Sequence, residues 1–294
     1  MLAGRGALIT GASRGLGLAI ARAFVRAGAE VAICARAQGP LLAAQSELLA
    51  LAHKDQRVEA LTADVADGEA VRELVATAAA RLRNLSVLVN NAGVQAPFGA
   101  LWEVDFELWE RTVRINLIGS ALLAREMVPH FEHAGSGKIV QISGGGASGP
   151  LEGISAYAAS KAGVVRLAET LALELASRHV EVNALAPGGL NTHMLDQVLE
   201  AGPERVGEDF YRRALAQQAS GGAPPERAAD LAVWLASSAS DGITGKLLSA
   251  VWDPWARLGE HRAELISDVY TLRRIVPADR GLDWGDVAGP GAGR

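Results

Sequence analysis

Short β-branched runs alternate with longer helical patterns from residue 5 to about 252, and this alternation constrains the fold more than any other feature of the chain. It is the sequence signature of a parallel sheet covered by helices. We expect strands near 5–10, 30–35, 57–62, 86–90, 138–142, 180–185 and 247–251. The strongest helical patterns cover 15–27, 69–82, 106–130, 155–177 and 226–237. The sequence therefore predicts an α/β fold.

The expected strands are continuously hydrophobic, as in 87–89 and 138–142, rather than alternating with polar residues. Strands of this kind are buried on both faces, so we expect helices on both sides of the sheet. A chain of 294 residues can form one large α/β domain or two small ones. Its apolar share of 49% and charged share of 21% are those of an ordinary soluble protein and argue against a disordered or disulfide-scaffold chain.

Charge and hydropathy exclude several functional classes. The net charge of −5 comes without a block of like charges, so the sequence gives no reason to expect nucleic-acid binding. No apolar stretch approaches the roughly 20 residues of a membrane span, and we expect no membrane partner. The single cysteine, Cys34, cannot form an internal disulfide and is interpreted as a buried strand residue. We therefore expect a cytoplasmic protein whose partner is a small molecule, with no metal site.

A glycine-rich turn follows the first expected strand directly and opens a helix. Glycines there allow a tight turn and close approach of the backbone to a pyrophosphate, whose charge is then met by the helix N-terminus. Glycine turns between a strand and a helix also occur for packing alone, but the strand–turn–helix context favours a dinucleotide site. We predict that the cofactor contacts this turn through Gly11, Ser13, Arg14, Gly15, Leu16 and Gly17.

The end of the second expected strand selects the adenosine half of the cofactor. An acidic residue there would accept hydrogen bonds from the ribose hydroxyls of NAD(H), but this chain has Ala35 followed by Arg36. Arg36, helped by Arg14, can pair with a 2′-phosphate, so we expect NADP(H) in preference to NAD(H). The alternative is that both arginines are solvated surface charges. Asp64 and Val65, just past the third strand, are candidates to hold the adenine.

Tyr157 and Lys161 are four residues apart in an expected helix, which places both side chains on one face. An unperturbed tyrosine has a pKa near 10, so proton exchange near neutral pH needs a nearby cation that favours the phenolate. Lys161 can supply that cation. A Tyr/Lys pair at this spacing also arises by chance in many surface helices, so the pair needs further support.

Five motifs in order supply that support: Thr10–Gly17, Asn90–Gly93, Asn116, Tyr157-x-x-x-Lys161 and Pro187-Gly188. With them the chain resembles the short-chain dehydrogenase/reductase family from residue 5 to about 251. The resemblance implies a doubly wound Rossmann sheet of seven parallel strands with helices on both faces, assembled as a dimer or tetramer. It also implies an oxidoreductase that reduces a carbonyl to an alcohol, or the reverse, by hydride transfer to or from NADP(H).

The resemblance assigns roles residue by residue. Tyr157 would be the general acid for carbonyl reduction or the base for alcohol oxidation. Lys161 would also hydrogen-bond the nicotinamide ribose, and Asn116 would hold a water in the proton relay. The remaining cofactor contacts implied by the family motifs are Asn91, Ala92, Gly93, Pro187, Gly188 and Thr192.

One position departs from the family pattern. The family's catalytic serine stands thirteen residues before the tyrosine, and that position is Gly144 here, with Ser143 one place earlier. Neighbouring side chains in a strand point to opposite faces, so Ser143 would face the substrate only if the strand had already ended. We expect Ser143 to be the substrate-orienting hydroxyl, with Ser148 and Ser155 as rivals and a serine-free site as a further alternative.

Two other functions stay open at this stage. Loss of the serine position is compatible with an NADP(H)-binding sensor or structural protein that has lost turnover. An epimerase or dehydratase that passes through a keto intermediate would show no net consumption of NADPH. Retention of Tyr157, Lys161 and Asn116 together favours the oxidoreductase, because a sensor has no chemical need for all three.

Two segments extend this pattern. We divide the chain into a Rossmann domain over 1–251, with an excursion over 193–225 that we expect to build the substrate site, and a C-terminal extension over 252–294. Tryptophans in the extension, among them Trp284, suggest docking onto a neighbouring subunit or over the substrate pocket, and simple surface packing is the alternative. We expect the last residues to be disordered. The apolar pocket-side candidates are Val94, Leu151, Leu190 and Met194.

Overall fold

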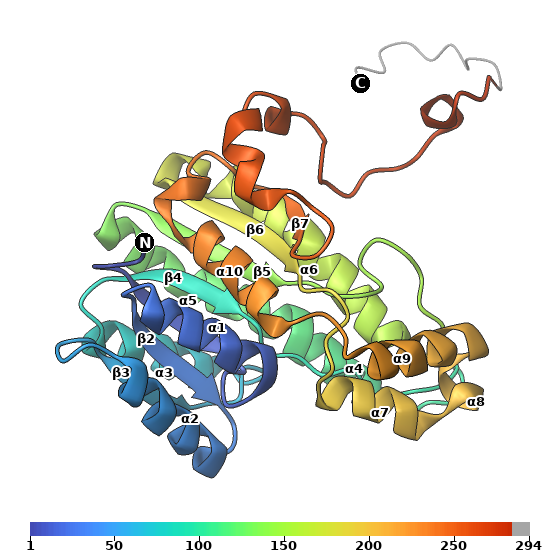
Figure 1. Ribbon diagram of the computed structural model, residues 1–294, viewed down its shortest axis with the longest axis horizontal. Helices are drawn as coiled ribbons and strands as arrows, with labels where there is room; N and C mark the ends of the chain where they lie inside the picture. Colours follow the sequence, from blue (N-terminus) through green and yellow to red (C-terminus); the bar gives the residue numbers. More distant parts are fainter. Residues whose placement is uncertain (284–294) are drawn as a thin grey trace.

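The computed structural model describes residues 1–283 and contains one sheet of seven parallel strands (Figure 1). The strand order is β3-β2-β1-β4-β5-β6-β7, and every neighbouring pair is parallel. The doubly wound sheet that the sequence predicts is therefore confirmed. The strands are β1 (Gly6–Thr10), β2 (Glu30–Ala35), β3 (Val58–Thr62), β4 (Leu85–Asn90), β5 (Gly137–Ile142), β6 (Val180–Ala186) and β7 (Leu247–Ser249).

Helices cover both faces of the sheet. One hydrophobic cluster joins the sheet to α1 (Gly15–Arg26), α2 (Gln38–Leu51) and α10 (Pro225–Ala236). The other joins it to α3 (Gly68–Arg81), α5 (Gly119–Ala134) and α6 (Ser155–Glu174). Because both faces are covered, the central strands are buried along their whole length, which explains why their sequences lack polar alternation.

The helical stretch expected over 106–130 is present, but it is not a regular α-helix throughout. The structure has α4 (Phe106–Val113), a turn of π-helix over Arg114–Ile118 and then α5. A π-turn inserts one residue into the helical ladder and is frequent at functional sites. Asn116, which is 1% exposed, lies inside this turn, and its backbone carbonyl accepts a hydrogen bond from Ser120 Oγ at 2.8 Å. Hydrophobic periodicity continues through such a turn, so the sequence pattern does not reveal it.

Three helices stand between β6 and α10, in the segment predicted as an excursion. They are α7 (His193–Ala201), α8 (Pro203–Val206) and α9 (Glu208–Ser220), and they lie together at one end of the molecule near α4 (Figure 1). The backbone of α8 packs so closely on Gly153 that a Cβ there would collide with the Arg205 carbonyl. The excursion therefore contacts the loop that leads into α6.

The C-terminal extension packs on the domain as far as about residue 272. It contains the short 3-10 helices η4 (Trp255–His261), η5 (Glu264–Ile266) and η6 (Pro277–Arg280). The Trp255 ring lies 6.1 Å from that of Trp234 in α10, and Lys246 Nζ donates to the carbonyls of Ser267 and Val269 at 2.8 and 3.0 Å. Beyond this anchored part the chain runs away from the body (Figure 1). Trp284 and the expected disordered end lie outside the described residues.

The extension also covers the outer edge of β7, the last strand of the sheet. The Leu247 backbone N–H donates to the Tyr270 carbonyl at 2.8 Å, and the Ser249 N–H donates to Asp253 Oδ2 at 2.6 Å. Both groups point away from β6 because alternate residues of a strand hydrogen-bond to opposite sides. The edge of the sheet is thus closed by the chain's own C-terminal segment.

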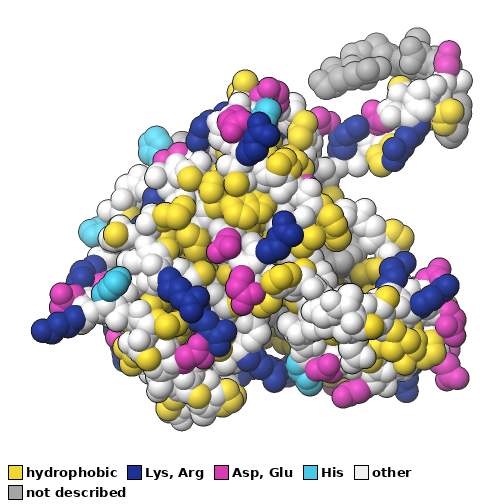
Figure 2. All heavy atoms as spheres, in the orientation of Figure 1, with side chains coloured by type: hydrophobic (Ala, Val, Ile, Leu, Met, Phe, Trp, Pro, Cys, Tyr) yellow, Lys and Arg dark blue, Asp and Glu magenta, His cyan; other side chains and the backbone are white. Residues whose placement is uncertain are grey.

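Cys34 is 1% exposed in β2, as the sequence predicts, and burial raises the pKa of its thiol to about 12. Acidic and basic side chains lie among one another on the face shown in Figure 2. Within residues 1–283, no helix is long and apolar enough to cross a membrane.

Candidate functional site

The chain order of the sheet reverses between β1 and β4, and ligands of open α/β sheets bind outside the carboxyl ends of the strands at this point. Asn91, directly after β4, joins the two strand ends. Its Nδ2 donates to the carbonyls of Thr10 and Gly11 at 2.9 and 3.1 Å, while the Thr10 hydroxyl accepts from the backbone of Asn91 and Ala92. The Thr10 side chain is not among the predicted site residues, although it stands at the start of the glycine turn.

The glycines of the turn occupy their positions for different structural reasons. Gly11 has φ +65°, and a Cβ on it would lie 2.8 Å from Ala92 Cα. A Cβ on Gly17 would collide with the Gly11 carbonyl, so close helix–strand packing requires glycine at both places. Gly15, with φ +58°, borders open space, because a Cβ there would meet only the Thr192 methyl, at 4.0 Å.

The other residues of the glycine turn lie beside the same open space at Gly15. Arg14 and Gly15 are exposed at the N-terminus of α1, Ser13 is half-buried, and Leu16 packs against the core. A free helix N-terminus beside open space at Gly15 and Thr192 fits a bound phosphate. The residues present therefore fit the pyrophosphate of a dinucleotide.

Two exposed arginines lie where the adenosine half was expected. The Arg14 and Arg36 guanidinium groups have no hydrogen-bond or ion-pair partner among residues 1–283. By contrast, Asp64 accepts from the Ala66 backbone N–H at 3.0 Å and lies 3.7 Å from Arg111. Its neighbour Val65 is 6% exposed and packs beneath α5, so only its backbone remains for an adenine contact.

The predicted pair in α6 comes together at the other end of the cleft. Tyr157 and Lys161 are 7% and 4% exposed, and Lys161 Nζ lies 5.7 Å from the centre of the Tyr157 ring. Lys161 Nζ donates to the Ile142 carbonyl at the end of β5, at 2.8 Å. A Cβ on Gly93 would lie 3.2 Å from Asn116 Oδ1 and 3.6 Å from Lys161 Nζ, so glycine lets the β4 loop pass close to both side chains.

Asn116 connects this pair to the β4 loop. Its Oδ1 accepts from the Val94 N–H and its Nδ2 donates to the Val94 carbonyl, both at 2.9 Å. The same Nδ2 donates to Ser160 Oγ at 2.9 Å, and Ser160 Oγ donates to the Tyr157 carbonyl at 2.7 Å. Ser160 is not among the site residues predicted from the sequence. Its position three residues after Tyr157, on the same face of the helix, was the signal that could have identified it.

Burial shifts the pKa values of the pair in opposite directions. It raises the pKa of Tyr157 to about 12 and lowers that of Lys161 to about 8. Burial therefore disfavours the Tyr157 phenolate in this structure, where Lys161 Nζ donates to the Ile142 carbonyl. Near neutral pH Tyr157 is protonated and can donate a proton.

Replacement of Lys161 by Met should stabilise the protein at neutral pH, because it removes a buried charge while the Met side chain has a length similar to that of Lys. The lowered pKa means that the folded state binds fewer protons than the unfolded state above about pH 8, so burial penalises wild type less as pH rises. The advantage of Lys161→Met should therefore shrink between about pH 8 and about pH 10.5. Urea unfolding at several pH values measures it, with exposed Lys54→Met as the matched control. A constant difference would contradict this assignment.

The position of the missing serine is filled by the tyrosine itself. Gly144 lies against the Tyr157 hydroxyl so closely that a Cβ on residue 144 would collide with it. Ser143 directly follows the last residue of β5, and its N–H still donates to the Leu185 carbonyl at 2.8 Å. Its buried Oγ has no hydrogen-bond partner among residues 1–283. Of its rivals, Ser155 Oγ accepts from Trp109 Nε1 at 3.0 Å and Ser148 is exposed.

The loop after β6 closes the nicotinamide end. Gly188 has φ +86° and packs on Val251, and the Gly189 carbonyl accepts from the Ala223 N–H at 2.7 Å. Gln217 Nε2 of α9 donates to the Leu190 carbonyl at 3.0 Å. The excursion therefore supports the segment that carries Pro187, Gly188 and Thr192.

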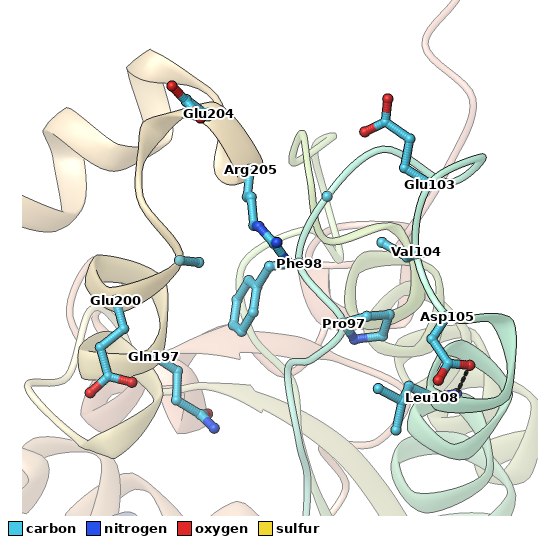
Figure 3. A pocket seen from close by; sticks show the side chains of 12 residues that line it. Pro97, Phe98, Glu103, Val104, Asp105, Leu108, Gln197, Glu200, Glu204 and Arg205 are labelled. Atoms are coloured by element: carbon cyan, nitrogen blue, oxygen red, sulfur yellow. Dashed lines mark hydrogen bonds between the residues drawn. The ribbon is translucent and has the colours of Figure 1, made fainter.

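A cavity of ≈ 690 Å³ opens between the loop after β4 and helices α7 and α8, where Phe98 and Arg205 approach from opposite walls (Figure 3). The loop is joined to the entry of α6 by a 2.8 Å bond from the Gly99 N–H to the Gly153 carbonyl. Tyr157 does not line the cavity, and neither do the apolar candidates of the sequence analysis. The lining residues are Pro97, Phe98, Gly99, Glu103, Val104, Asp105, Leu108, Gln197, Glu200, Ala201, Glu204 and Arg205.

Comparison with known proteins agrees with this geometry. The family model for the short chain dehydrogenase matches residues 5–202. The chain is 34% identical to "Dehydrogenase/reductase SDR family member 4" of Pongo abelii over 245 residues, which cover 83% of this chain and 85% of the relative. It is 36% identical to the cis-4-hydroxycyclohexanecarboxylate dehydrogenase of Sinomonas cyclohexanicum, with 83% and 94% covered. Among solved structures, the chain is similar to a tryptophan variant of actinorhodin polyketide ketoreductase with NADPH. The TM-score is 0.75 at 32% identity, and the match covers 83% of this chain and 95% of that chain.

Proposed function

Because this chain belongs to the short-chain dehydrogenase/reductase family, we propose that it interconverts a carbonyl and an alcohol with NADP(H), using Tyr157 as the general acid or base. The observation that carries the proposal is the placement of the buried Tyr157–Lys161 pair against the β4 loop at Gly93. A proton donor and a ribose-binding cation then face one cofactor cleft. Activity as an oxidoreductase follows from the family, and the residue roles and the cofactor choice are the proposal.

In the direction of reduction, bound NADPH would supply the hydride for the carbonyl carbon. Tyr157 Oη donates its proton to the carbonyl oxygen as negative charge develops there. The Lys161 ammonium lowers the free energy of the resulting phenolate and holds the nicotinamide ribose. Asn116 fixes the β4 loop through Val94 and orders Ser160 beside the Tyr157 backbone, which keeps the reacting groups in place.

The preference for NADP(H) is supported by Arg14 and Arg36, which have no partner within the described residues 1–283, and by the lack of a carboxylate at the end of β2. The related actinorhodin ketoreductase was solved with NADPH. Arg36→Asp should weaken NADPH binding by about 10–100-fold, the loss expected for charge-assisted bonds to a phosphate, and should leave NADH binding unweakened. Fluorescence titration measures both dissociation constants. Arg26→Asp is the control, because it makes the same charge change at an exposed site.

The test of the function is oxidation of NADPH and NADH, side by side, over a panel of ketones and keto-sugars. Consumption of NADPH that requires Tyr157 would support the reductase and begin to define its substrate. No NADPH oxidation over a broad panel, with NADPH still bound, would favour a sensor. The glycine at position 144, where the family has its catalytic serine, is the observation that motivates this alternative. Product formation without net NADPH consumption would favour an epimerase or dehydratase.

The remaining expectations are part of the same proposal. We propose that the protein forms a dimer or tetramer in the cytoplasm and that the excursion over 193–225 builds the substrate site. We also propose that the extension from residue 252 docks onto a neighbouring subunit or over the substrate pocket. Sedimentation analysis of the full chain tests the assembly.

A further inference from the structure

Buried polar side chains without hydrogen-bond partners gather in one place in this molecule. Among residues 1–283, buried side-chain atoms that lack a hydrogen-bond partner belong to Glu30, Glu169, Asn90, Gln95, Gln141 and Ser143. The two glutamates are ion-paired with arginines. The other four residues all stand at or just beyond the carboxyl ends of β4 and β5. The unsatisfied atoms therefore mark one region of the fold beside the catalytic groups.

Two of these residues share one face of the sheet, and a third directly follows β5. Asn90 and Gln141 are direct neighbours in the parallel pairing of β4 with β5. Gln141 lies between Val140 and Ile142, which pack on the α1 and α10 side, so its own side chain points toward α5 and α6. Ser143 stands two residues after Gln141, directly beyond the end of β5, and its N–H still donates to the Leu185 carbonyl of β6. Gln141 is 0% exposed, and both its Nε2 and its Oε1 lack partners.

Unsatisfied buried amides are rare in native proteins, and their usual partner is an ordered internal water. Such a water makes about three hydrogen bonds. Asn90 Oδ1, the two ends of the Gln141 amide and Ser143 Oγ supply donors and acceptors for it. We propose that Asn90, Gln141 and Ser143 form an internal water site, and that Gln141 acts through this water as a positioning residue for Asn116 and Lys161.

A hydrogen-bonded line leads from this site to the catalytic groups. Asn90 Nδ2 donates to the Ser120 carbonyl at 3.1 Å, and Ser120 Oγ donates to the Asn116 carbonyl at 2.8 Å. On the other side, the Ile142 carbonyl, one residue after Gln141, accepts from Lys161 Nζ at 2.8 Å. Water held by Gln141 thus fixes the π-turn that carries Asn116 and the strand end that holds Lys161.

The direct test is a high-resolution crystal structure of the full chain. We expect a water within hydrogen-bond distance of the Gln141 amide and of Asn90 Oδ1 or Ser143 Oγ. A direct bond from Gln141 Nε2 to Asn90 Oδ1 without water would overturn the site. This result does not depend on turnover, whereas the positioning role rests on the proposed function and is tested by kinetics.

Two variants separate water binding from packing. Gln141→Met keeps the volume and loses every hydrogen bond, while Gln141→Asn is shorter and keeps the amide. A misplacement of about 1 Å can cost about 10²-fold in rate, so we expect kcat to fall about 10-fold in Gln141→Met and less in Gln141→Asn, with KM for NADPH unchanged. If packing alone mattered, Met would be the better substitute, and that order would refute the role. Ile139→Leu, on the same face, is the control expected to keep kcat.

Discussion

Tyr157→Phe should lower kcat for carbonyl reduction by about 10²–10⁴-fold, the range that general acid–base groups contribute. The substitution removes only the hydroxyl, since the phenyl ring fits the same space, which is 7% exposed. NADPH binding should be unchanged, because the glycine turn, Arg36 and Lys161 are all retained. Stopped-flow or steady-state NADPH oxidation measures the first quantity, and fluorescence titration measures the second.

Tyr270→Phe is the matched control for this variant. It removes the same atom from a half-buried tyrosine in the C-terminal extension, and turnover should not change. If Tyr157→Phe kept wild-type turnover on a substrate that the enzyme reduces, the proton would have to come from another group and the mechanism above would be wrong.

Gly17→Ala should remove most NADP(H) binding and destabilise the fold. A Cβ on residue 17 would collide with the Gly11 carbonyl and would lie 2.5 Å from Asn91 Nδ2 and 2.9 Å from Ala12 Cα. Two of these neighbours are backbone atoms, so the turn itself must shift. Overpacking of this kind costs about 1–3 kcal/mol of the free energy of unfolding. NADPH affinity should fall at least about 10-fold, because the shift also breaks the bonds by which Asn91 shapes the turn.

Gly39→Ala is the control for this change. Gly39 lies in α2, and a Cβ there would meet nothing within 4 Å, so the variant should be as stable as wild type or slightly more so. Thermal unfolding and NADPH titration of both variants test the argument together. Wild-type affinity in Gly17→Ala would show that the turn does not hold the cofactor.

Much of the fold could be predicted because each local signal agreed with the others. The unbroken apolar runs of the strands predicted a sheet covered on both faces, and the four-residue spacing of Tyr157 and Lys161 placed both on one side of a helix, as the structure confirms. Both signals depend on neighbours in sequence. The pattern is therefore sufficient where local geometry alone decides the outcome.

Local patterns failed where tertiary contacts decide. The π-turn at Asn116 leaves the hydrophobic periodicity intact, so the sequence predicted the helical stretch over 106–130 but not the π-turn inside it. The sequence could pose the choice between Ser143 and Gly144 but could not resolve it, because the answer depends on how far β5 stays paired with β6. The pKa of Tyr157 likewise depends on burial, and the partner of Lys161 is the Ile142 carbonyl; neither can be read from the spacing of the two residues.

The closed edge of β7 affects how this protein can meet other chains. A sheet normally ends in a row of free backbone groups that can recruit a strand from another molecule, which is a common start of aggregation. At β7 the outward N–H groups of Leu247 and Ser249 are already bonded to Tyr270 and Asp253. Any incoming strand must first displace the chain's own terminal segment. The extension therefore acts as a built-in competitor, and growth of the sheet in that direction is blocked without a second protein.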